Sequence, residues 1–217
     1  MVSFEKLIHA KHSAILAIDV QNDFCHPEGG QARQGFDISA MSAVVPNIIK
    51  LIEEGRKAGV PVIFIRNGHS KWTRSEVWNN KKRESNRDLL CEEGTWGADF
   101  YKLKPLSGER IIVKYRYDAF IGTNLDLILS NAGIKTLIMS GVTTNTCVES
   151  TARHGFMLDY NIVFLENCTA TNHIAEHEAT LHNIEENFGY VHTSAELFRV
   201  WSALLSKKEQ PAPLAST

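Results

Sequence analysis

Short, almost uninterrupted apolar runs alternate along this chain with segments whose apolar residues recur at helical spacing. The predicted strands cover residues 13–18, 61–65, 110–113, 136–139 and 161–165, with a short edge strand at 190–191. The predicted helices cover residues 41–58, 123–131, 147–158, 173–187 and 194–205. Strands that are apolar along their whole length are typical of a parallel sheet buried on both faces. Because parallel strands need right-handed crossovers, the pattern predicts an α/β fold, a three-layer α/β/α arrangement with a mostly parallel central sheet.

The length of 217 residues and the hydrophobic content of 43% predict a single domain with a core of ordinary size. We expect this domain to span residues 1–205 and a flexible, proline-containing C-terminal tail to span 206–217. A long polar loop insertion at about 68–109 interrupts the alternation of strands and helices and contains three of the four tryptophans. Insertions of this length in a compact domain are usually functional.

The charge and the cysteine pattern exclude several classes of function. A formal net charge of −2 gives no electrostatic support for binding nucleic acid or an anionic membrane. The sequence has no run of about 18 apolar residues that could span a bilayer, and its first residues lack the apolar centre of a secretory signal. We therefore expect a cytoplasmic protein. In that reducing compartment the cysteines are expected to be free thiols, and they show no CxxC spacing; they are Cys25, Cys91, Cys147 and Cys168.

Residues 136–153 contain the strongest chemical signal. A short apolar strand ends in Ser140-Gly141, a small polar turn follows, and Cys147 then stands at the start of a predicted helix. Backbone amides at a helix start stabilise a thiolate, which is the nucleophilic form of cysteine. The segment therefore indicates a nucleophile that attacks an electrophilic carbon. The alternative is a buried cysteine that packs as a small hydrophobic residue.

Two further reactive side chains are predicted at the same sheet edge. The first strand ends at Asp19 and the third at Lys114, and ligands of open parallel sheets bind outside the carboxyl ends of the strands. Lys114 can favour the Cys147 thiolate by its charge, and Asp19 can take the thiol proton and return it to a leaving amine. Backbone N–H groups of Thr143 and Cys147 can form an oxyanion hole. Each residue also has a structural alternative, since Asp19 suits a turn and Lys114 suits a solvated strand end.

Together these residues resemble the isochorismatase-like cysteine hydrolases. The matching motifs are AIDVQNDF at 17–24, VKYRYDAF at 113–120 and GVTTNTCV at 141–148. The resemblance implies a Rossmann-like hydrolase fold, a catalytic triad of Asp19, Lys114 and Cys147, and a cis peptide between Val142 and Thr143. The isochorismatases of this family lack the cysteine, so Cys147 implies cleavage of a C–N bond through a thioester.

The resemblance also bears on metals and cofactors. Nicotinamidases of this family carry a metal-binding Asp-x-His after the second strand, where this chain has Asn67-Gly68-His69. An amide in place of the acid removes a charged ligand, so we expect no metal and no cofactor. His173 and His177 have a spacing that can bind zinc on a helix, but the glutamates beside them favour a solvated helix face.

Within the family, the chain is most similar to the ureidoacrylate amidohydrolase-type branch. The similar segments are 94–96, 116–117 with Phe120, 147–151 with 155–156, and 183–185 with 188–189. Hydrogen-bonding and stacking side chains near the predicted edge are the candidate substrate-binding residues; they are Asn67, Trp96, Tyr117 and Phe120. Ordinary packing in a core or loop is the alternative for each of them.

The predicted function is that of a cysteine-dependent amidohydrolase acting on a small ureido, carbamoyl or carboxamide substrate, with release of ammonia or carbamate. A nicotinamidase-like carboxamidase is the first alternative, and a non-catalytic small-molecule-binding member of the fold is the second. The resemblance further implies a homodimer or homotetramer whose other partner is its small-molecule substrate. Cleavage of a C–N bond by Cys147 remains the leading hypothesis because all three triad residues occupy the expected positions.

Overall fold

A computed structural model describes residues 3–84 and 89–209 of the chain. Its described residues form a six-stranded sheet in the order β3-β2-β1-β4-β5-β6, and each neighbouring pair of strands is parallel. The strands are β1 (Ser13–Ile18), β2 (Val62–Asn67), β3 (Arg110–Lys114), β4 (Thr136–Val142), β5 (Asn161–Ala170) and β6 (Tyr190–His192). The predicted parallel sheet, including its short edge strand β6, is thereby confirmed.

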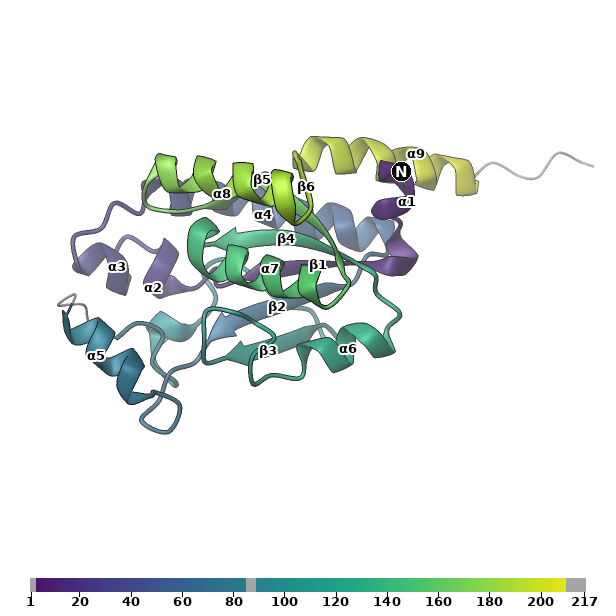
Figure 1. Cartoon of the computed structure of the whole chain (residues 1–217). Helices are drawn as coiled ribbons and strands as arrows, with labels where there is room; N and C mark the ends of the chain where they lie inside the picture. Colours follow the sequence, from purple (N-terminus) through teal and green to yellow (C-terminus); the bar gives the residue numbers. More distant parts are fainter. Residues whose placement is uncertain (1–2, 85–88, 210–217) are drawn as a thin grey trace, which may run out of the picture.

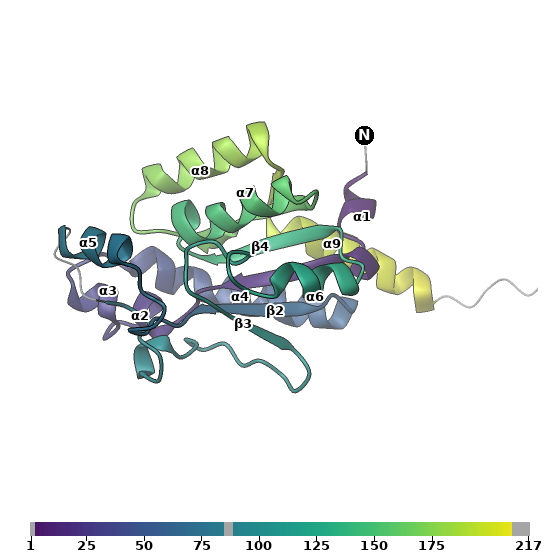
Figure 2. The same cartoon turned by 60° about the horizontal axis from the view of Figure 1, so that its bottom comes forward.

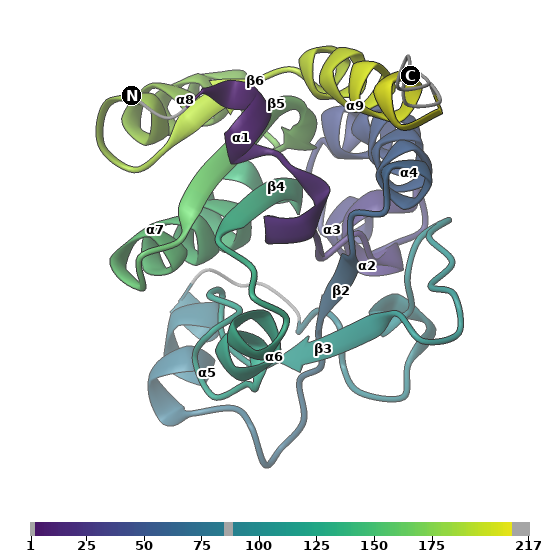
Figure 3. The same cartoon turned by 90° about the vertical axis from the view of Figure 1, so that its right-hand side faces the viewer.

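Helices cover both faces of the sheet, as Figure 3 shows in a view along the strands. The helices are α1 (Phe4–Leu7), α2 (Asn22–Cys25), α3 (Gly30–Arg33), α4 (Ser39–Ala58), α5 (Glu76–Glu84), α6 (Leu125–Asn131), α7 (Glu149–Met157), α8 (Ile174–Asn187) and α9 (Ser194–Glu209). Helices α4 and α9 lie on one face, and α6, α7 and α8 lie on the other. This arrangement is the predicted three-layer α/β/α fold.

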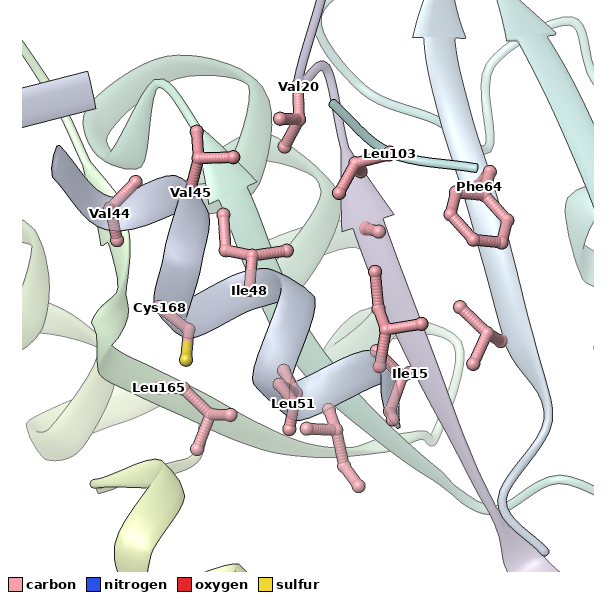
Figure 4. Close-up of a cluster of buried hydrophobic side chains, with 14 of the residues drawn as sticks. Ile15, Val20, Val44, Val45, Ile48, Leu51, Phe64, Leu103, Leu165 and Cys168 are labelled. Carbon is pink, nitrogen blue, oxygen red and sulfur yellow. The ribbon is translucent and has the colours of Figure 1, made fainter. Parts of the chain in front are cut away.

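Helix α4 forms where apolar residues recur at helical spacing, and it ends at Gly59. Gly59 has a φ of 78°, a left-handed conformation that glycine adopts easily at a helix C-terminus. Figure 4 shows the apolar stripe of α4 packed against side chains of the sheet. Val45, Ile48 and Leu51 are fully buried there beside Ile15 of β1. Burial of a side chain of this size contributes about 1.5–3 kcal/mol to folding.

Three segments differ in detail from the predictions. The helix predicted from residue 147 begins instead with a π-turn, η3 (Thr144–Val148), so Cys147 lies in this turn and not in regular α-helix. The insertion contains helix α5 and the short 3₁₀ helix η2 (Trp96–Ala98). Helix α9 continues to Glu209, so the tail predicted from residue 206 begins inside it, and residues 210–217 lie outside the described residues.

The strand order reverses direction between β1 and β4. The chain moves outward from β1 to β2 and β3, then returns to β4 on the other side of β1. Loops after β1 and β4 therefore diverge and leave a crevice at their carboxyl ends, where ligands of open α/β sheets bind. Figure 1 shows α2, α3 and α5 gathered at this end of the sheet, at the left of the view.

Within residues 3–84 and 89–209, we find no helix that combines the length and the apolar character needed to cross a membrane.

Gly141 permits the close approach of β4 to β1 beside this crevice. It has a φ of 123°, and a Cβ built on it would lie 2.0 Å from the carbonyl oxygen of Ile18. We expect Gly141→Ala to lower the free energy of unfolding by about 3 kcal/mol or more, because the backbone of β1 cannot move aside cheaply. Urea denaturation measures this loss.

Gly133→Ala is the matched control for Gly141→Ala. Gly133 also has a positive φ, 68°, but a Cβ there would meet no atom within 4 Å. Backbone strain alone then predicts a loss of about 1–2 kcal/mol. Equal losses in the two variants would contradict the role of close contact at Gly141.

Candidate active site

Asp19 and Lys114 form an ion pair that is completely buried. Asp19 follows the last residue of β1, and Lys114 is the last residue of β3. The Lys114 Nζ lies 2.8 Å from Asp19 Oδ2, and neither side chain is exposed to solvent. The Cys147 thiol lies within hydrogen-bonding reach of both groups. The structure thus brings together the three side chains that the strand ends predicted, although they come from residues far apart in the sequence.

Burial dominates the protonation of Cys147. Burial, the largest cause, and the nearby Asp19 carboxylate together raise the pKa of the Cys147 thiol to about 12. The positive charge of Lys114 lowers the pKa of Cys147, as the sequence predicted, but this effect is smaller than that of burial. At neutral pH the resting form of Cys147 is therefore the thiol, and a thiolate needs a base to form.

The buried pair shows opposing electrostatic effects. Burial raises the pKa of Asp19 above its ordinary value, although Lys114 acts in the opposite direction. Burial alone would lower the pKa of Lys114, but the negative charge of Asp19 and the hydrogen bonds of the ammonium group outweigh this effect and raise the pKa. Lys114 is consequently a stable cation, while Asp19 is a stronger base than an exposed aspartate.

Asn67 connects Lys114 to Asp19. Asn67 is the last residue of β2 and lies opposite Lys114 in the pairing of β2 with β3. The Lys114 ammonium donates to Asn67 Oδ1 at 3.0 Å and to the Arg116 carbonyl at 3.0 Å, in addition to pairing with Asp19. A hydrogen bond from Asn67 also lowers the pKa of Asp19. The three donors of the ammonium group therefore each face an acceptor.

Gln21 fixes the position of Asn67, a role that the sequence analysis missed. The buried Gln21 amide donates to the Asn67 carbonyl at 2.9 Å and accepts from the Asn67 N–H at 2.8 Å. It also donates to the Ala98 carbonyl at 2.7 Å. Its side chain thus continues the hydrogen-bond ladder beyond β2. A polar residue three positions after a buried strand was the available signal.

A cavity of about 260 Å³ opens beside Cys147 at the carboxyl ends of the strands. Of the residues predicted to bind substrate or an oxyanion, Asn67, Tyr117, Thr143 and Cys147 line it. Amides and hydroxyls supply most of its other polar lining; these residues are Gln31, Gln34, Asn145, Thr146, Thr171 and Asn172. Thr171 and Asn172 directly follow β5, which continues to Ala170. The strand predicted from the sequence ended at residue 165, so the strand-end rule did not identify them.

Trp96 and Phe120 do not line this cavity. Trp96 is 47% exposed, and its ring lies edge-on to His26, 4.8 Å away between centroids. Phe120 is buried in the core beneath α7, where its ring contacts the rings of His154 and Tyr160. The predicted substrate contacts of these two residues have no support in this geometry, because their side chains are directed into packing contacts elsewhere.

The insertion covers the site of its own chain. Trp78 of α5 lines the cavity, and its ring lies 5.1 Å from the ring of His69 and 4.8 Å from that of Tyr117. Asp23 anchors the insertion because its Oδ2 accepts from the Cys91 N–H at 2.6 Å. Trp78 is therefore a lining residue that the sequence analysis left unassigned.

The start of α8 borders the cavity. His173 and Glu176 are exposed, in keeping with the predicted solvated helix face, and both line the cavity. The half-buried His177 departs from that prediction. His177 Nδ1 lies 2.9 Å from the hydroxyl of the buried Thr144. Burial lowers the pKa of His177, so its ring is neutral near pH 7.

The residues at the position of the nicotinamidase metal site do not fit a metal centre. Asn67 is a neutral amide whose oxygen accepts from Lys114, and the His69 ring packs against Trp78. Among residues 3–84 and 89–209, no three His, Cys, Asp or Glu side chains are grouped so that they could hold a metal ion.

The peptide bond between Val142 and Thr143 is cis, as the resemblance implied. Thr143 and Cys147 both border the cavity at this point. The oxyanion hole formed by their backbone N–H groups stays a prediction.

Replacement of Gln21 tests whether its side chain holds the backbone of Asn67 in place. We expect Gln21→Leu to lower the free energy of unfolding by about 3 kcal/mol, because it leaves buried backbone groups of Asn67 and Ala98 unpaired. Chemical denaturation measures the loss. Asn47→Ala removes one exposed hydrogen bond to the Asn167 carbonyl and should cost about 1 kcal/mol or less. If Gln21→Leu lowers the free energy of unfolding no more than Asn47→Ala does, Gln21 does not hold Asn67 in place.

Known sequences resemble this chain over most of its length. Residues 13–196 match the isochorismatase domain. The ureidoacrylate amidohydrolase RutB of Agrobacterium fabrum is 35% identical over 198 residues, which cover 83% of this chain and 86% of that protein. RutB of Azorhizobium caulinodans is 34% identical over 220 residues, which cover 93% of this chain and 96% of that protein.

Solved structures share the fold. A cysteine hydrolase from Pseudomonas syringae pv. phaseolicola superposes with a TM-score of 0.80 at 25% identity, covering 91% of this chain and 95% of that one. N-carbamoylsarcosine amidase from Thermoplasma acidophilum has a TM-score of 0.69 at 24% identity, covering 84% of this chain and 96% of that one. At this level of identity, the similarity shows a shared fold only. The chain therefore belongs to the isochorismatase family and is a hydrolase that acts on non-peptide carbon–nitrogen bonds.

Proposed function

We propose that this hydrolase uses Cys147 as its nucleophile and cleaves a C–N bond of a small ureido compound. The observation that carries the proposal is the buried cluster of Asp19, Lys114 and Cys147 at the wall of a cavity. A base, a fixed cation and a thiol within hydrogen-bonding reach are the parts that covalent hydrolysis of an amide requires. The relatives named as ureidoacrylate amidohydrolases support a ureido group as the target.

The first chemical step forms the carbon–sulfur bond. Asp19 accepts the proton of the Cys147 thiol as the sulfur attacks the substrate carbonyl carbon. Transfer of the proton during attack avoids a free buried thiolate, which the pKa of about 12 disfavours. Lys114 remains protonated and stabilises the negative charge that moves from Asp19 towards the substrate oxygen.

The second step breaks the carbon–nitrogen bond. Asp19 returns the proton to the leaving nitrogen, which departs as ammonia or an amine and leaves a thioester on Cys147. A water molecule then adds to the thioester carbonyl while Asp19 accepts one of its protons. Collapse of this second tetrahedral intermediate restores the Cys147 thiol and releases a carbamate or carboxylate. Each proton taken by Asp19 is thus returned within one turnover.

The cavity lining suits a small planar group rich in N–H and C=O. Asn67, Asn145 and Asn172 offer amides, and Thr146 and Thr171 offer hydroxyls, so both donors and acceptors surround the substrate. Its volume of about 260 Å³ is below the roughly 300–1,000 Å³ typical of pockets for drug-sized ligands. The lining therefore favours a compact ureido compound.

A substrate screen tests the function directly. We expect the wild-type protein to release ammonia from at least one compound in a panel of ureido acids, biuret-like compounds and aryl carboxamides. Cys147→Ser should lower kcat by at least about 10³-fold, because a hydroxyl beside Asp19 is a much weaker nucleophile than a thiol. Mass spectrometry of the quenched wild-type reaction should show an adduct on Cys147.

Three outcomes of the screen would decide between the candidates. Turnover undiminished in Cys147→Ser would disprove the mechanism. Turnover of aryl carboxamides but not of ureido compounds would favour a nicotinamidase-like activity. The absence of turnover with any compound, together with no alkylation of Cys147 at neutral pH, would favour a non-catalytic binding protein.

The pH profile tests the role of Asp19. The carboxyl group must be ionised to accept the thiol proton, and burial raises the pKa of Asp19 above its ordinary 3.8. As the pH falls through this raised pKa, the base becomes protonated and activity is lost. We therefore expect kcat/KM to decline on the acid side with a midpoint above pH 3.8.

The alkaline limb of the pH profile and the variant Asp19→Asn provide the controls for the acid limb. The pKa of Lys114 is raised above 10.5 and that of Cys147 to about 12, so the midpoint of any alkaline decline is expected above pH 10.5. Asp19→Asn should lower kcat by about 10²–10⁴-fold, the usual contribution of a general base. An acid midpoint at or below pH 3.8 would contradict the assignment of Asp19.

A further inference from the structure

One face of α8 contacts the turn that carries Cys147. Figure 2 shows α8 beside α7, which follows this turn directly. His177 Nδ1 lies 2.9 Å from the Thr144 hydroxyl, and the Asn145 amide donates to Glu176 at 2.8 Å. Both contacts reach residues of η3 from the first turn of α8.

Glu149 is the centre of a second group of contacts between the two helices. It is the first residue of α7, and its side chain is 14% exposed. Its Oε2 accepts from Thr180 Oγ1 at 2.8 Å, and its Oε1 accepts from Asn183 Nδ2 at 3.0 Å. Arg153, one turn further along α7, donates to Oε1 through Nε at 3.0 Å and Nη2 at 2.6 Å. One carboxylate thus accepts hydrogen bonds from both helices.

The turn around Cys147 also has hydrogen bonds of its own. The Thr143 carbonyl accepts from the N–H groups of Thr146 and Val148, both at 3.2 Å. The Cys147 carbonyl accepts from the Thr151 hydroxyl at 2.8 Å. These hydrogen bonds join neutral groups, whereas those to a carboxylate are charge-assisted and stronger. Because Glu149 lies two residues after Cys147, its contacts with α8 act on the same short length of chain.

We propose that Glu149 is a positioning residue that fixes Cys147 relative to Asp19 through hydrogen bonds to α8. The inference rests on the proposed role of Cys147 as the nucleophile. Asp19 directly follows β1 and Cys147 lies in the turn after β4, so their separation depends on where η3 lies relative to the sheet. A shift of about 1 Å at a reacting atom can lower a rate about 10²-fold. Glu149 touches neither reacting group, so its effect acts through geometry.

The alternative is that Glu149 serves only the stability of α7. Its pair with Arg153 has the i, i+4 spacing of an ordinary helix-surface ion pair, which contributes little to stability. The two roles involve different partners. The contacts with Thr180 and Asn183 would matter for positioning, whereas the contact with Arg153 would matter for helix stability.

The experiment compares Glu149→Ala and Asn183→Ala with the control Arg153→Ala. Kinetics use the ureido compound that the wild-type protein hydrolyses fastest. A second readout, independent of substrate, is the rate at which iodoacetamide alkylates Cys147 at pH 7, followed by mass spectrometry. Asn183→Ala keeps a good helix former at a half-buried position of α8, so it tests the contact even if Glu149→Ala folds poorly.

We expect Glu149→Ala to lower kcat by about 10–100-fold with KM changed by less than about threefold, because a positioning loss affects the transition state. Asn183→Ala should lower kcat in the same way but less, and alkylation of Cys147 should slow in both variants. Arg153→Ala should keep kcat within about twofold of wild type. Non-additive effects in the Glu149 and Asn183 double variant would confirm their coupling.

The proposal would be overturned by unchanged kcat and alkylation in both variants, or by an equal loss in Arg153→Ala. A wild-type protein that hydrolyses no compound would refute the proposed function instead. In that case the alkylation rates would still report whether Glu149 controls the environment of Cys147.

Discussion

The site depends on the buried ion pair between Asp19 and Lys114. Removing both charges from water costs several kcal/mol for each ion, and the pair persists only where geometry and further hydrogen bonds compensate. The compensation here comes from Asn67, from the Arg116 carbonyl and from the 2.8 Å contact itself. These groups converge because parallel strands end at one edge of the sheet, so the fold itself positions the ion pair.

The same burial determines how the chemistry can proceed. It raises the pKa of Cys147 to about 12, so the thiol is stable and reacts only when its proton has somewhere to go. Asp19, whose pKa is also raised, is a suitable acceptor at neutral pH. In the proposed mechanism this burial couples the attack of sulfur to proton transfer. The insertion contributes Trp78 to the wall of the cavity beside Cys147.

Residues at strand ends could be predicted from the sequence, whereas side chains in loops and on helix faces could not. Asp19, Lys114 and Cys147 were predictable because the apolar runs define strand ends, and strand ends share an edge. The side chains of Trp96 and Phe120 were not, because the path of an irregular loop and the direction of an aromatic ring depend on distant neighbours. His177 was misjudged for a related reason: a sequence cannot say which face of an amphipathic helix meets a polar turn.

The sequence by itself determined the order of the strands along the chain, the parallel sheet and the three reactive side chains at its edge. These follow from local periodicity and from the few right-handed connections that parallel strands allow. The tertiary structure alone decided that Cys147 rests as a thiol, that Asn67 lies between Lys114 and Asp19, and that α8 contacts the turn that carries Cys147. Burial and hydrogen-bond geometry arise only when distant segments meet, and no local pattern encodes the desolvation that sets a pKa.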